Sequence, residues 1–476
     1  MGVTLHGTAH HPATAGVRSP AHPRRRLLLG VLCLAQFMLI VDVTVINVAL
    51  PAIGADLHLG RSALTWAVTA YTLCFGGLML LGGRLADGYG ARRVLTAGLV
   101  LFTAASLAGG LAEGPGVLLA ARSAQGVGAA LVSPAALAAL TRAFDGPERT
   151  RALGVWAMLG GIGFAAGAML GGLLTAGPGW HWVFFVNLPV GVGVLAALPA
   201  LLPPSGPSGA HRTDLPGALL VTAATGSLIL GLVDAGDDGW GSAGVLLPVL
   251  GSALFYVLFA VVERRTAAPL MDVRLLARRP VAAGSLLMLV ATALLLGLVF
   301  LGSLYLQDVR GLSALATGAL VLPMAAGTAV AAHLTARLLA HAAVRSVAVG
   351  GLLLAAAGSA LSAFTGGPAW TVAGLTLAGF GVVPVLVCAT TTALGSVPHR
   401  EAGVASGVVN TFHGVGGAVG IAVVSTVAAP GITAHSAAGF PAAHLVLAGA
   451  ALLTAALAAV LVPPGRAERP AGVHGH

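Results

Sequence analysis

The sequence predicts an all-α polytopic membrane protein, and three observations support this fold class. Of the 476 residues, 57% are hydrophobic and only 8% are charged, whereas an ordinary soluble protein carries about 25% charged residues. The apolar residues gather in stretches of about 20, the length that crosses the hydrocarbon core of a bilayer as a helix. Most arginines lie in the short segments between these stretches. Water is therefore not the main solvent of this chain.

Fourteen apolar stretches are candidate transmembrane helices. They lie near 27–50, 64–82, 94–112, 117–140, 153–175, 182–202, 217–235, 243–262, 281–306, 319–339, 346–364, 370–394, 403–428 and 444–463. An even number of spans places both termini on one side, and a cytoplasmic N terminus then assigns 21 of the 24 arginines to cytoplasmic segments. Only Arg61 and Arg310 fall in outer loops, and Arg122 falls inside a span. Because cytoplasmic loops are enriched in basic residues, we expect a multi-pass membrane protein with both termini in the cytoplasm.

Composition also excludes several classes of function. The chain contains no lysine, so it has neither a Walker A loop for ATP nor a lysine for a pyridoxal Schiff base. The fifteen histidines show no metal-ligand spacing, and no nucleophile–base constellation for an intramembrane enzyme or sensor is recognisable. We attribute the basic pI to membrane topology rather than to nucleic-acid binding. We expect no cofactor and no enzymatic activity, so that transport would draw on an ion gradient.

The flanking segments differ in composition from the spans. Residues 1–23 are rich in His, Pro and Gly and are expected to be a disordered cytoplasmic N terminus. The stretch 203–216 reads as a linker, and 464–476 as a cytoplasmic tail.

Several motifs in order carry a resemblance to a known family. They read DVTVINVALP, GGRLADGYGARRV, LLAARSAQGVGAALVSPAAL, GGIGFAAGAMLGG, WHWVFFVNLPVG, YLQDVRGLSALATG and AGVASGVVNTFHGVGGAVG. Together they resemble the major facilitator superfamily (MFS), and within it the fourteen-helix drug:proton antiporters. The resemblance implies two six-helix bundles at 27–202 and 281–463, with two inserted transmembrane helices at 217–262. It also implies a substrate cavity between the bundles near the middle of the membrane.

The loop after the second span is expected to form a cytoplasmic gate. It contains Gly83, Asp87, Gly90, Arg92 and Arg93, in which the glycines allow tight turning and close helix approach. By the family resemblance, Asp87 pairs with an arginine or a helix N-terminus of the other bundle when the cavity faces outward. The alternative is a basic loop that only fixes topology.

The fifth span carries a stripe of glycines, the antiporter motif of the family. Gly160, Gly163, Gly167 and Gly171 repeat at +3, +7 and +11, and Gly172 is counted with them. Such a stripe lets two helix backbones approach closely. The resemblance assigns it a helix contact that limits leak, and the alternative is generic small-residue packing.

Asp42 and Arg122 are the charged residues expected to lie well inside spans. Counting from the span ends at 1.5 Å per residue, Asp42 lies roughly 14 Å and Arg122 roughly 8 Å below the outer surface, so both occupy the outer half of the membrane. Gln125 follows Arg122 on the same helix face. Asp42 and Asn47 are about 140° apart around their helix, so they cannot both line the cavity, and we expect one of them to pack against a neighbouring helix. Asp42 would take up a proton outside and release it inside; the alternative is a static ion pair.

His413 lies near the middle of the thirteenth span, with Asn410 and Gly417 on its face. Histidine titrates near neutral pH, so His413 is a candidate second protonation site or cargo contact. A satisfied core histidine is an equally good interpretation, and His333 in the tenth span is a weaker candidate.

The resemblance implies a proton-coupled antiporter that exports lipophilic drugs or antibiotics across the bacterial inner (plasma) membrane by alternating access. Its partners would be a small lipophilic substrate, protons and the lipid bilayer, without nucleic acid or an obligate protein partner, and it would act as a monomer. The alternative is a dedicated exporter or facilitator of one natural metabolite on the same fold.

Overall fold

The computed structural model describes residues 22–203, 214–266, 269, 273–364, 367–395, 397 and 402–464. Within these residues the chain forms fourteen helices that are long and apolar enough to cross a membrane, which confirms the predicted number. Most predicted boundaries lie within a few residues of the observed ones. Residues 1–21 and 465–476, including almost all of the predicted N terminus and tail, lie outside the described residues.

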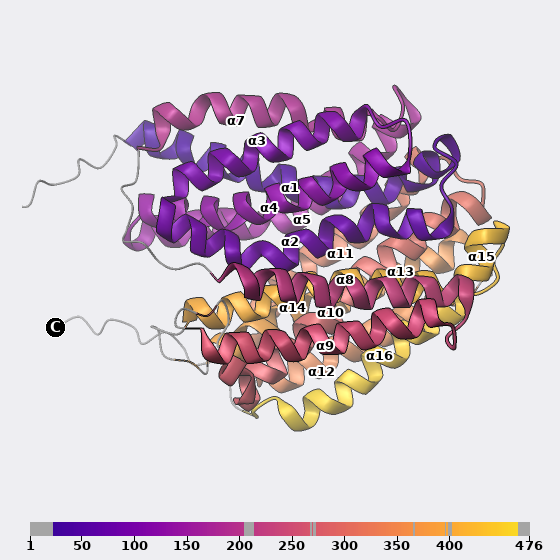
Figure 1. The fold of residues 1–476 in the computed structure, drawn as a ribbon. Coiled ribbons are helices and arrows are strands. Elements are labelled where there is room, and N and C mark those ends of the chain that lie inside the picture. Colours follow the sequence, from indigo (N-terminus) through magenta and orange to yellow (C-terminus); the bar gives the residue numbers. More distant parts are fainter. Residues whose placement is uncertain are drawn as a thin grey trace, which may run out of the picture.

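The helices of the first half form one bundle, coloured indigo to magenta in Figure 1. They are α1 (His22–Asp56), α2 (Arg61–Tyr89), α3 (Ala91–Gly110), α4 (Pro115–Ala143), α5 (Gly146–Ala176), α6 (Trp182–Phe185) and α7 (Asn187–Leu201). The short α6 and α7 together make the sixth span. Apolar residues such as Leu95 and Phe102, both fully buried, form the core of this bundle.

The helices of the second half form the other bundle, coloured orange to yellow. They are η1 (Val273–Ala277), α10 (Arg279–Leu304), η2 (Tyr305–Val309), α11 (Ala314–Leu339), α12 (Val344–Ser362), α13 (Pro368–Leu394), α14 (Ala402–Val427), α15 (Ala429–Ala434) and α16 (Phe440–Leu461). The described ends of the chain, at α1 and α16, lie at the same end of the molecule (Figure 1). We call this the terminal end and the opposite one the far end.

Two further helices, α8 (Leu215–Asp238) and α9 (Ala243–Arg265), lie between the bundles in sequence and across their junction in space (Figure 1). Helix α8 packs against α2 of one bundle and α14 of the other. Helix α9 packs mainly against α8 and exposes large apolar side chains such as Leu247, which is 70% exposed. Such a helix requires an apolar surrounding, as a bilayer provides.

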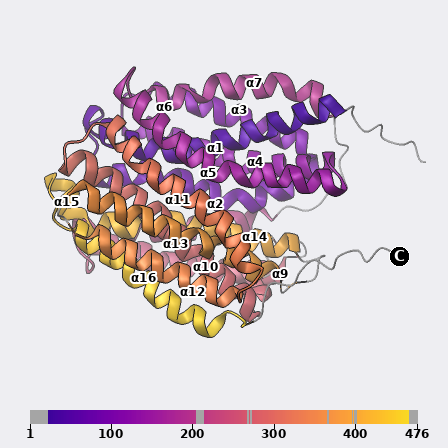
Figure 2. The same ribbon diagram turned by 180° about the vertical axis from the view of Figure 1, so that it is seen from behind.

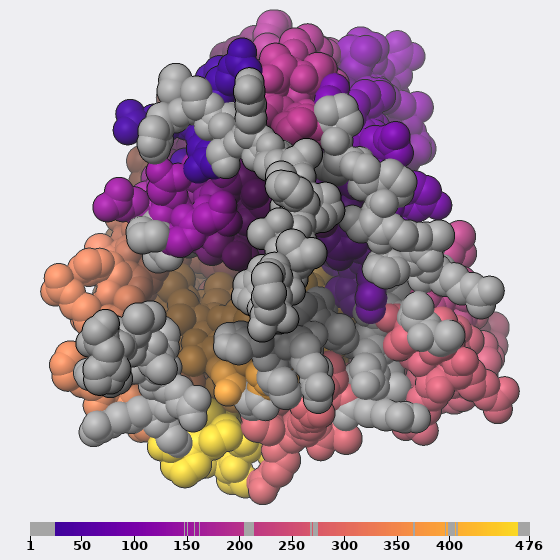
Figure 3. Space-filling view, turned by 90° about the vertical axis from the view of Figure 1, so that its left-hand side faces the viewer, coloured from indigo at the N-terminus to yellow at the C-terminus, as the bar shows by residue number. Residues whose placement is uncertain are grey.

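The bundles are joined by polar contacts at the far end. Ser303 Oγ donates to the backbone oxygen of Asn47 at 2.5 Å, and Gln307 Nε2 donates to that of Val48 at 2.9 Å. Thr65 and Ser425 join α2 to α14 through hydroxyls 2.5 Å apart. At the terminal end the surface is recessed between the bundles (Figure 3). The structure is therefore closed toward the far end.

Candidate functional site

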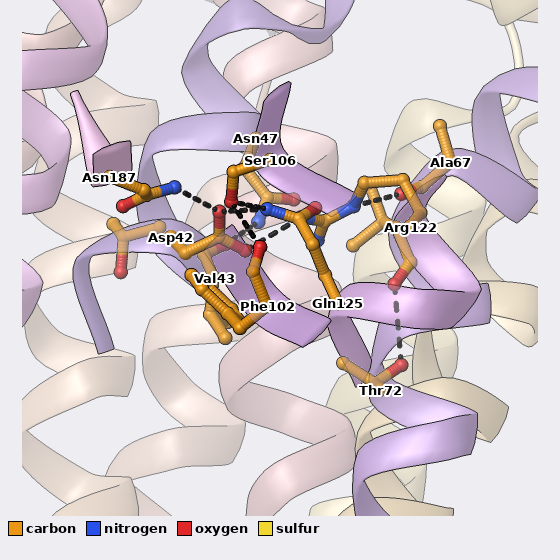
Figure 4. Close-up of polar contacts among 12 residues, drawn as sticks. Asp42, Val43, Asn47, Ala67, Thr72, Phe102, Ser106, Arg122, Gln125 and Asn187 are labelled. Carbon is orange, nitrogen blue, oxygen red and sulfur yellow. Dashed lines mark hydrogen bonds and ion pairs between the residues drawn. The ribbon is translucent and has the colours of Figure 1, made fainter. Parts of the chain in front are cut away.

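Asp42 lies at the centre of a buried polar cluster within the first bundle (Figure 4). The residue is 1% exposed. Its Oδ2 accepts a hydrogen bond from Arg122 Nη1 at 2.6 Å, which is also an ion pair. Its Oδ1 accepts from Gln125 Nε2 at 3.1 Å and from Asn187 Nδ2 at 3.0 Å. Side chains of α4 and α7 thus converge on the carboxylate carried by α1, and the sequence-predicted pair is in contact.

The position of Arg122 is fixed by further contacts. Its Nε donates to the backbone oxygen of Ala67 at 2.9 Å, and its Nη1 also donates to Gln125 Oε1 at 2.9 Å. Its guanidinium lies over the ring of Tyr71, 4.6 Å from the ring centre, in cation–π geometry. Gln125 Nε2 in turn donates to Ser106 Oγ at 2.9 Å. Arg122 and Gln125, three residues apart, share one helix face, so a single face of α4 supplies both groups.

This cluster is electrostatically demanding because burying charges costs free energy unless they are paired and hydrogen-bonded. Both side chains of the ion pair are almost fully buried, at 1% exposure for Arg122 and 2% for Asp42. The Asp42 carboxylate is paired and hydrogen-bonded by three donors from two other helices. A proton can therefore reach Asp42 only if these bonds rearrange.

Asp42 and Asn47 are each only 1% exposed, so neither lines a cavity in this conformation. Asn47 Nδ2 donates to the backbone oxygen of Val43 at 2.7 Å. Asn187 and Ser106 belong to the cluster but were not singled out from the sequence. Asn187 stands in the apolar stretch WHWVFFVNLPVG, and an amide in such surroundings is the signal that would have drawn attention to it.

His413 on α14 is exposed, unlike Asp42. Its neighbour Gly414 packs directly against Gly76 of α2, and Gly416 packs against α10. Ala422, which packs in the cluster that includes Ile229 and Val233 of α8, is about 180° around the helix from His413 at 100° per residue. His413 therefore points away from α8, between α2 and α10, and lies between the bundles rather than in a packed core.

The predicted gate residues lie at the terminal end, where α2 meets α3. Gly90 has φ 91°, a left-handed conformation that favours glycine, and it joins the two helices. Asp87 forms an ion pair of 3.2 Å with Arg142 of α4, which belongs to the same bundle. Among the residues that the structure describes, Asp87 forms no pair with the other bundle, and that pairing remains a prediction for the outward-facing conformation. Arg92 is half-buried and Arg93 exposed. Gly83 makes only a loose contact, because a Cβ there would lie 3.8 Å from Pro134 Cβ.

The glycine stripe of α5 packs on α1 for part of its length. A Cβ added at Gly163 would lie 2.7 Å from Ile40, one at Gly167 2.7 Å from Thr44, and one at Gly171 3.0 Å from Val48. These close approaches fix α5 against the face of α1 opposite to Asp42, since residues two apart on a helix differ by about 200°.

The two ends of the stripe behave differently. Gly160 is exposed, and a Cβ there would meet nothing within 4 Å, so the continuous stripe expected from the sequence ends at Gly163. Gly172 faces the other bundle, where a Cβ would lie 2.8 Å from Ala314 O and from Leu315 Cα of α11. The glycines thus serve two contacts, one within the first bundle and one between the bundles.

Comparison with known proteins places the chain in a family. The sequence pattern of the Major Facilitator Superfamily matches residues 32–421. The chain belongs to this superfamily. The chain is 39% identical to the puromycin resistance protein pur8 of Streptomyces alboniger, with 92% of each chain covered. It is also 39% identical to the cephamycin export protein CmcT of Amycolatopsis lactamdurans, with 93% of each covered.

Solved structures show the same fold at lower sequence identity. A bacterial homologue of the lysosomal transporter Spinster superposes with a TM-score of 0.65 at 16% identity, covering 93% of this chain and 98% of that one. A peptide transporter of the POT family gives a TM-score of 0.66, also at 16% identity, covering 90% and 93%. Membership of the superfamily, together with the fourteen apolar helices, makes the chain a multi-pass inner-membrane transporter of small molecules and not an enzyme.

Arg61 also joins helices, although the sequence predicted only that it lies in an outer loop. Its side chain is 1% exposed and forms an ion pair of 2.7 Å with Asp237 of α8. Its Nη2 donates to the backbone oxygen of Val233 at 2.5 Å, and its Nη1 donates to Ser425 Oγ at 3.4 Å. One arginine thus joins α2, α8 and α14 at the far end. The nearby Asp234 and Asp237 are a signal in the sequence that could have suggested a basic partner.

Proposed function

We propose that this transporter exports lipophilic antibiotics from the cytoplasm in exchange for protons. The observation that carries the proposal is the sealed Asp42–Arg122 ion pair in a chain 39% identical to named antibiotic resistance and export proteins. A buried carboxylate inside a membrane span is costly and is retained mainly where it serves transport of ions or protons.

The proposed orientation places the terminal end in the cytoplasm. It is supported by the arginines, which concentrate in segments at that end, such as Arg24, Arg25 and Arg26 at the start of α1. With this orientation the conformation described here is closed to the outside and faces the cytoplasm. Cargo would enter the recess at the terminal end and meet His413 and Asn410 between the bundles.

Helix α1 connects the contacts that close the far end of the protein to Asp42, the proposed site of protonation. The backbone oxygens of Asn47 and Val48 hold α1 to Ser303 and Gln307 of the other bundle, and Asp42 lies about one and a half turns away. When the bundles rock open to the outside, these two bonds break, and α1 is free to shift against α4 and α7. We propose that this shift loosens the donors around Asp42 and lets it accept a proton from outside. Return to the conformation described here would expel the proton as the pair with Arg122 re-forms.

The proton gradient supplies enough free energy for this cycle. One charge crossing 100 mV gives about 2.3 kcal/mol, and one pH unit gives about 1.4 kcal/mol. Either quantity corresponds to an accumulation of tenfold or more.

A dedicated exporter of one natural product is the second candidate. It is favoured by the relatives, several of which are named after a single antibiotic: puromycin, cephamycin or lincomycin. The multidrug resistance protein Stp of Mycobacterium tuberculosis, 35% identical, favours the broader function.

Growth inhibition and efflux together test the proposal. A host that lacks its own efflux pumps, expressing the full chain, is exposed to dyes and several antibiotic classes, and efflux of a protected compound is followed with and without an uncoupler. We expect protection that the uncoupler abolishes and that Asp42→Asn removes. The charge-matched control Glu113→Gln, in an exposed loop, should behave as wild type. Protection against one scaffold only would select the dedicated exporter, whereas efflux by Asp42→Asn at the wild-type rate would refute proton coupling at Asp42.

A further inference from the structure

The inserted helices cover one of the two junctions between the bundles. Helix α8 lies over the seam between α2 and α14 and packs against both (Figure 1). The other junction, between α5 and α11, lies on the opposite face of the molecule, which is in front in Figure 2. When the bundles of an MFS protein rock against each other, α2 and α14 part at the far end. Helix α8 cannot then stay attached to both.

The contact that attaches α8 to α2 at the far end is charged and buried. Arg61, in the first turn of α2, donates from Nε to Asp237 Oδ1 at 3.0 Å and from Nη2 to the backbone oxygen of Val233 at 2.5 Å. Its side chain is 1% exposed. A Cβ added at Gly236 would lie 2.8 Å from Arg61 Cζ, so the guanidinium lies directly on the backbone of α8. Separating α8 from α2 would leave a buried arginine without its counter-charge, which is strongly unfavourable.

The polar contact that attaches α8 to α14 is neutral and can be replaced. Thr426 Oγ1 of α14 donates to the backbone oxygen of Leu232 of α8, and it also donates to that of Ala422 on its own helix at 2.9 Å. On the α2 side of the same seam, Thr65 Oγ1 donates to the backbone oxygen of Arg61 at 3.0 Å. A hydroxyl that has an acceptor one turn back on its own helix stays hydrogen-bonded when its partner helix leaves. The seam along α14 therefore opens without leaving these hydroxyls unpaired.

We propose that α8 and α9 form a latch that stays on the first bundle and releases α14 when the far end opens. Arg61 and Asp237 hold the latch, and the bonds to Thr426 and Ser425 are those that break. Arg61 Nη1 lies 3.4 Å from Ser425 Oγ, which is long for a hydrogen bond. Among the residues that the structure describes, the other acceptors of the Arg61 guanidinium all belong to α8. Helix α9 packs mainly against α8 and moves with it.

Distances between spin labels at the far end test which bundle the latch follows. Labels on Gly60, Gly241 and Thr433, taken two at a time, report on the start of α2, on the turn between α8 and α9, and on α15 directly after α14. All three positions are exposed, and a Cβ at either glycine would meet nothing within 4 Å. The full-length protein is used, with its three native cysteines replaced by alanine, and the distances are measured by double electron–electron resonance.

Ser425→Trp forces the seam apart, because Ser425 is fully buried between the helices. We expect the distances from Thr433 to Gly60 and to Gly241 to lengthen together by roughly 4–5 Å, about half the spacing of packed helices. The distance from Gly60 to Gly241 should stay unchanged. The matched control Leu445→Trp, at an exposed position on α16, should leave all three distances as in wild type.

Two further variants separate the latch from the seam. Adding Arg61→Gln to Ser425→Trp should lengthen and broaden the distance from Gly60 to Gly241, because the latch loses its attachment to α2. If Ser425→Trp does not fold, Thr65→Val with Ser425→Ala removes the bond across the seam without adding bulk. In that variant the two distances from Thr433 should gain a longer minor population together.

The proposal is overturned if the latch follows α14, so that the distance from Gly60 to Gly241 lengthens while that from Gly241 to Thr433 does not. It is also overturned if neither opening variant changes the distance from Gly60 to Thr433, because the seam would then not open. The readout is a distance within the protein and depends neither on the cargo nor on proton coupling.

Discussion

Removal of the charge on Asp42 should destabilise the folded protein measurably. Arg122 Nη1 lies 2.6 Å from Asp42 Oδ2, and both side chains are at most 2% exposed. Asp42→Asn keeps the shape of the side chain but leaves the arginine buried without a counter-charge. Breaking a buried pair in this way costs about 3–5 kcal/mol. The contacts of Arg122 with Ala67 and Tyr71 remain, so we expect the lower value, about 3 kcal/mol.

Unfolding in mixed micelles with increasing dodecyl sulfate, followed by circular dichroism, measures this change. The double variant Asp42→Asn/Arg122→Gln removes both charges and should recover the free energy of unfolding to within about 1 kcal/mol of wild type, because no unpaired charge is left buried. Glu113→Gln should change it by no more than about 0.5 kcal/mol, as an exposed surface substitution.

Two results would contradict this reasoning. A loss below about 1 kcal/mol for Asp42→Asn would mean that Asp42 does not act as the counter-charge of Arg122 in the folded state. Uphill efflux by the stable double variant, still sensitive to an uncoupler, would show that the pair is static and that the proton is carried elsewhere.

Three further predictions concern helix packing, cargo and the inserted helices. Gly167→Val should cost about 1–3 kcal/mol of unfolding free energy by overpacking against α1, whereas Gly160→Val should be neutral in the same micelle assay; equal losses would refute the assigned contact. His413→Gln should leave stability within about 0.5 kcal/mol but alter the KM for efflux, and an unchanged KM for every protected compound would remove His413 from the cargo path. Arg61→Gln should speed hydrogen exchange in the last turns of α8 by about tenfold or more, since hydrogen bonds to charged groups contribute about 1.5–3 kcal/mol. Ser425→Ala should have a smaller effect. Unchanged exchange in Arg61→Gln would contradict the contact of Arg61 with three helices.

The sequence by itself determined the membrane class, the number of spans and the approximate depth of the charged residues. Hydropathy and arginine placement are properties of short windows, and the bilayer turns them into helices of fixed length. The depth of a residue then follows from counting along its own helix. For this reason Asp42 and Arg122 could be assigned to the same half of the membrane before any contact between them was known.

Tertiary structure alone decided which residues meet across helices. An amide in an apolar stretch marks Asn187 as unusual, but many polar residues share a similar depth, so the sequence does not show that Asn187 and Ser106 join the Asp42 cluster. Gly160 has the same spacing as Gly163 but no helix opposite it, because the packing partner belongs to a distant segment. Burial of Arg61 likewise depends on α8 and α14, remote in sequence from α2. Rotation of each helix about its axis is set by such neighbours, and it decided that Asp42 is enclosed while His413 faces the space between the bundles.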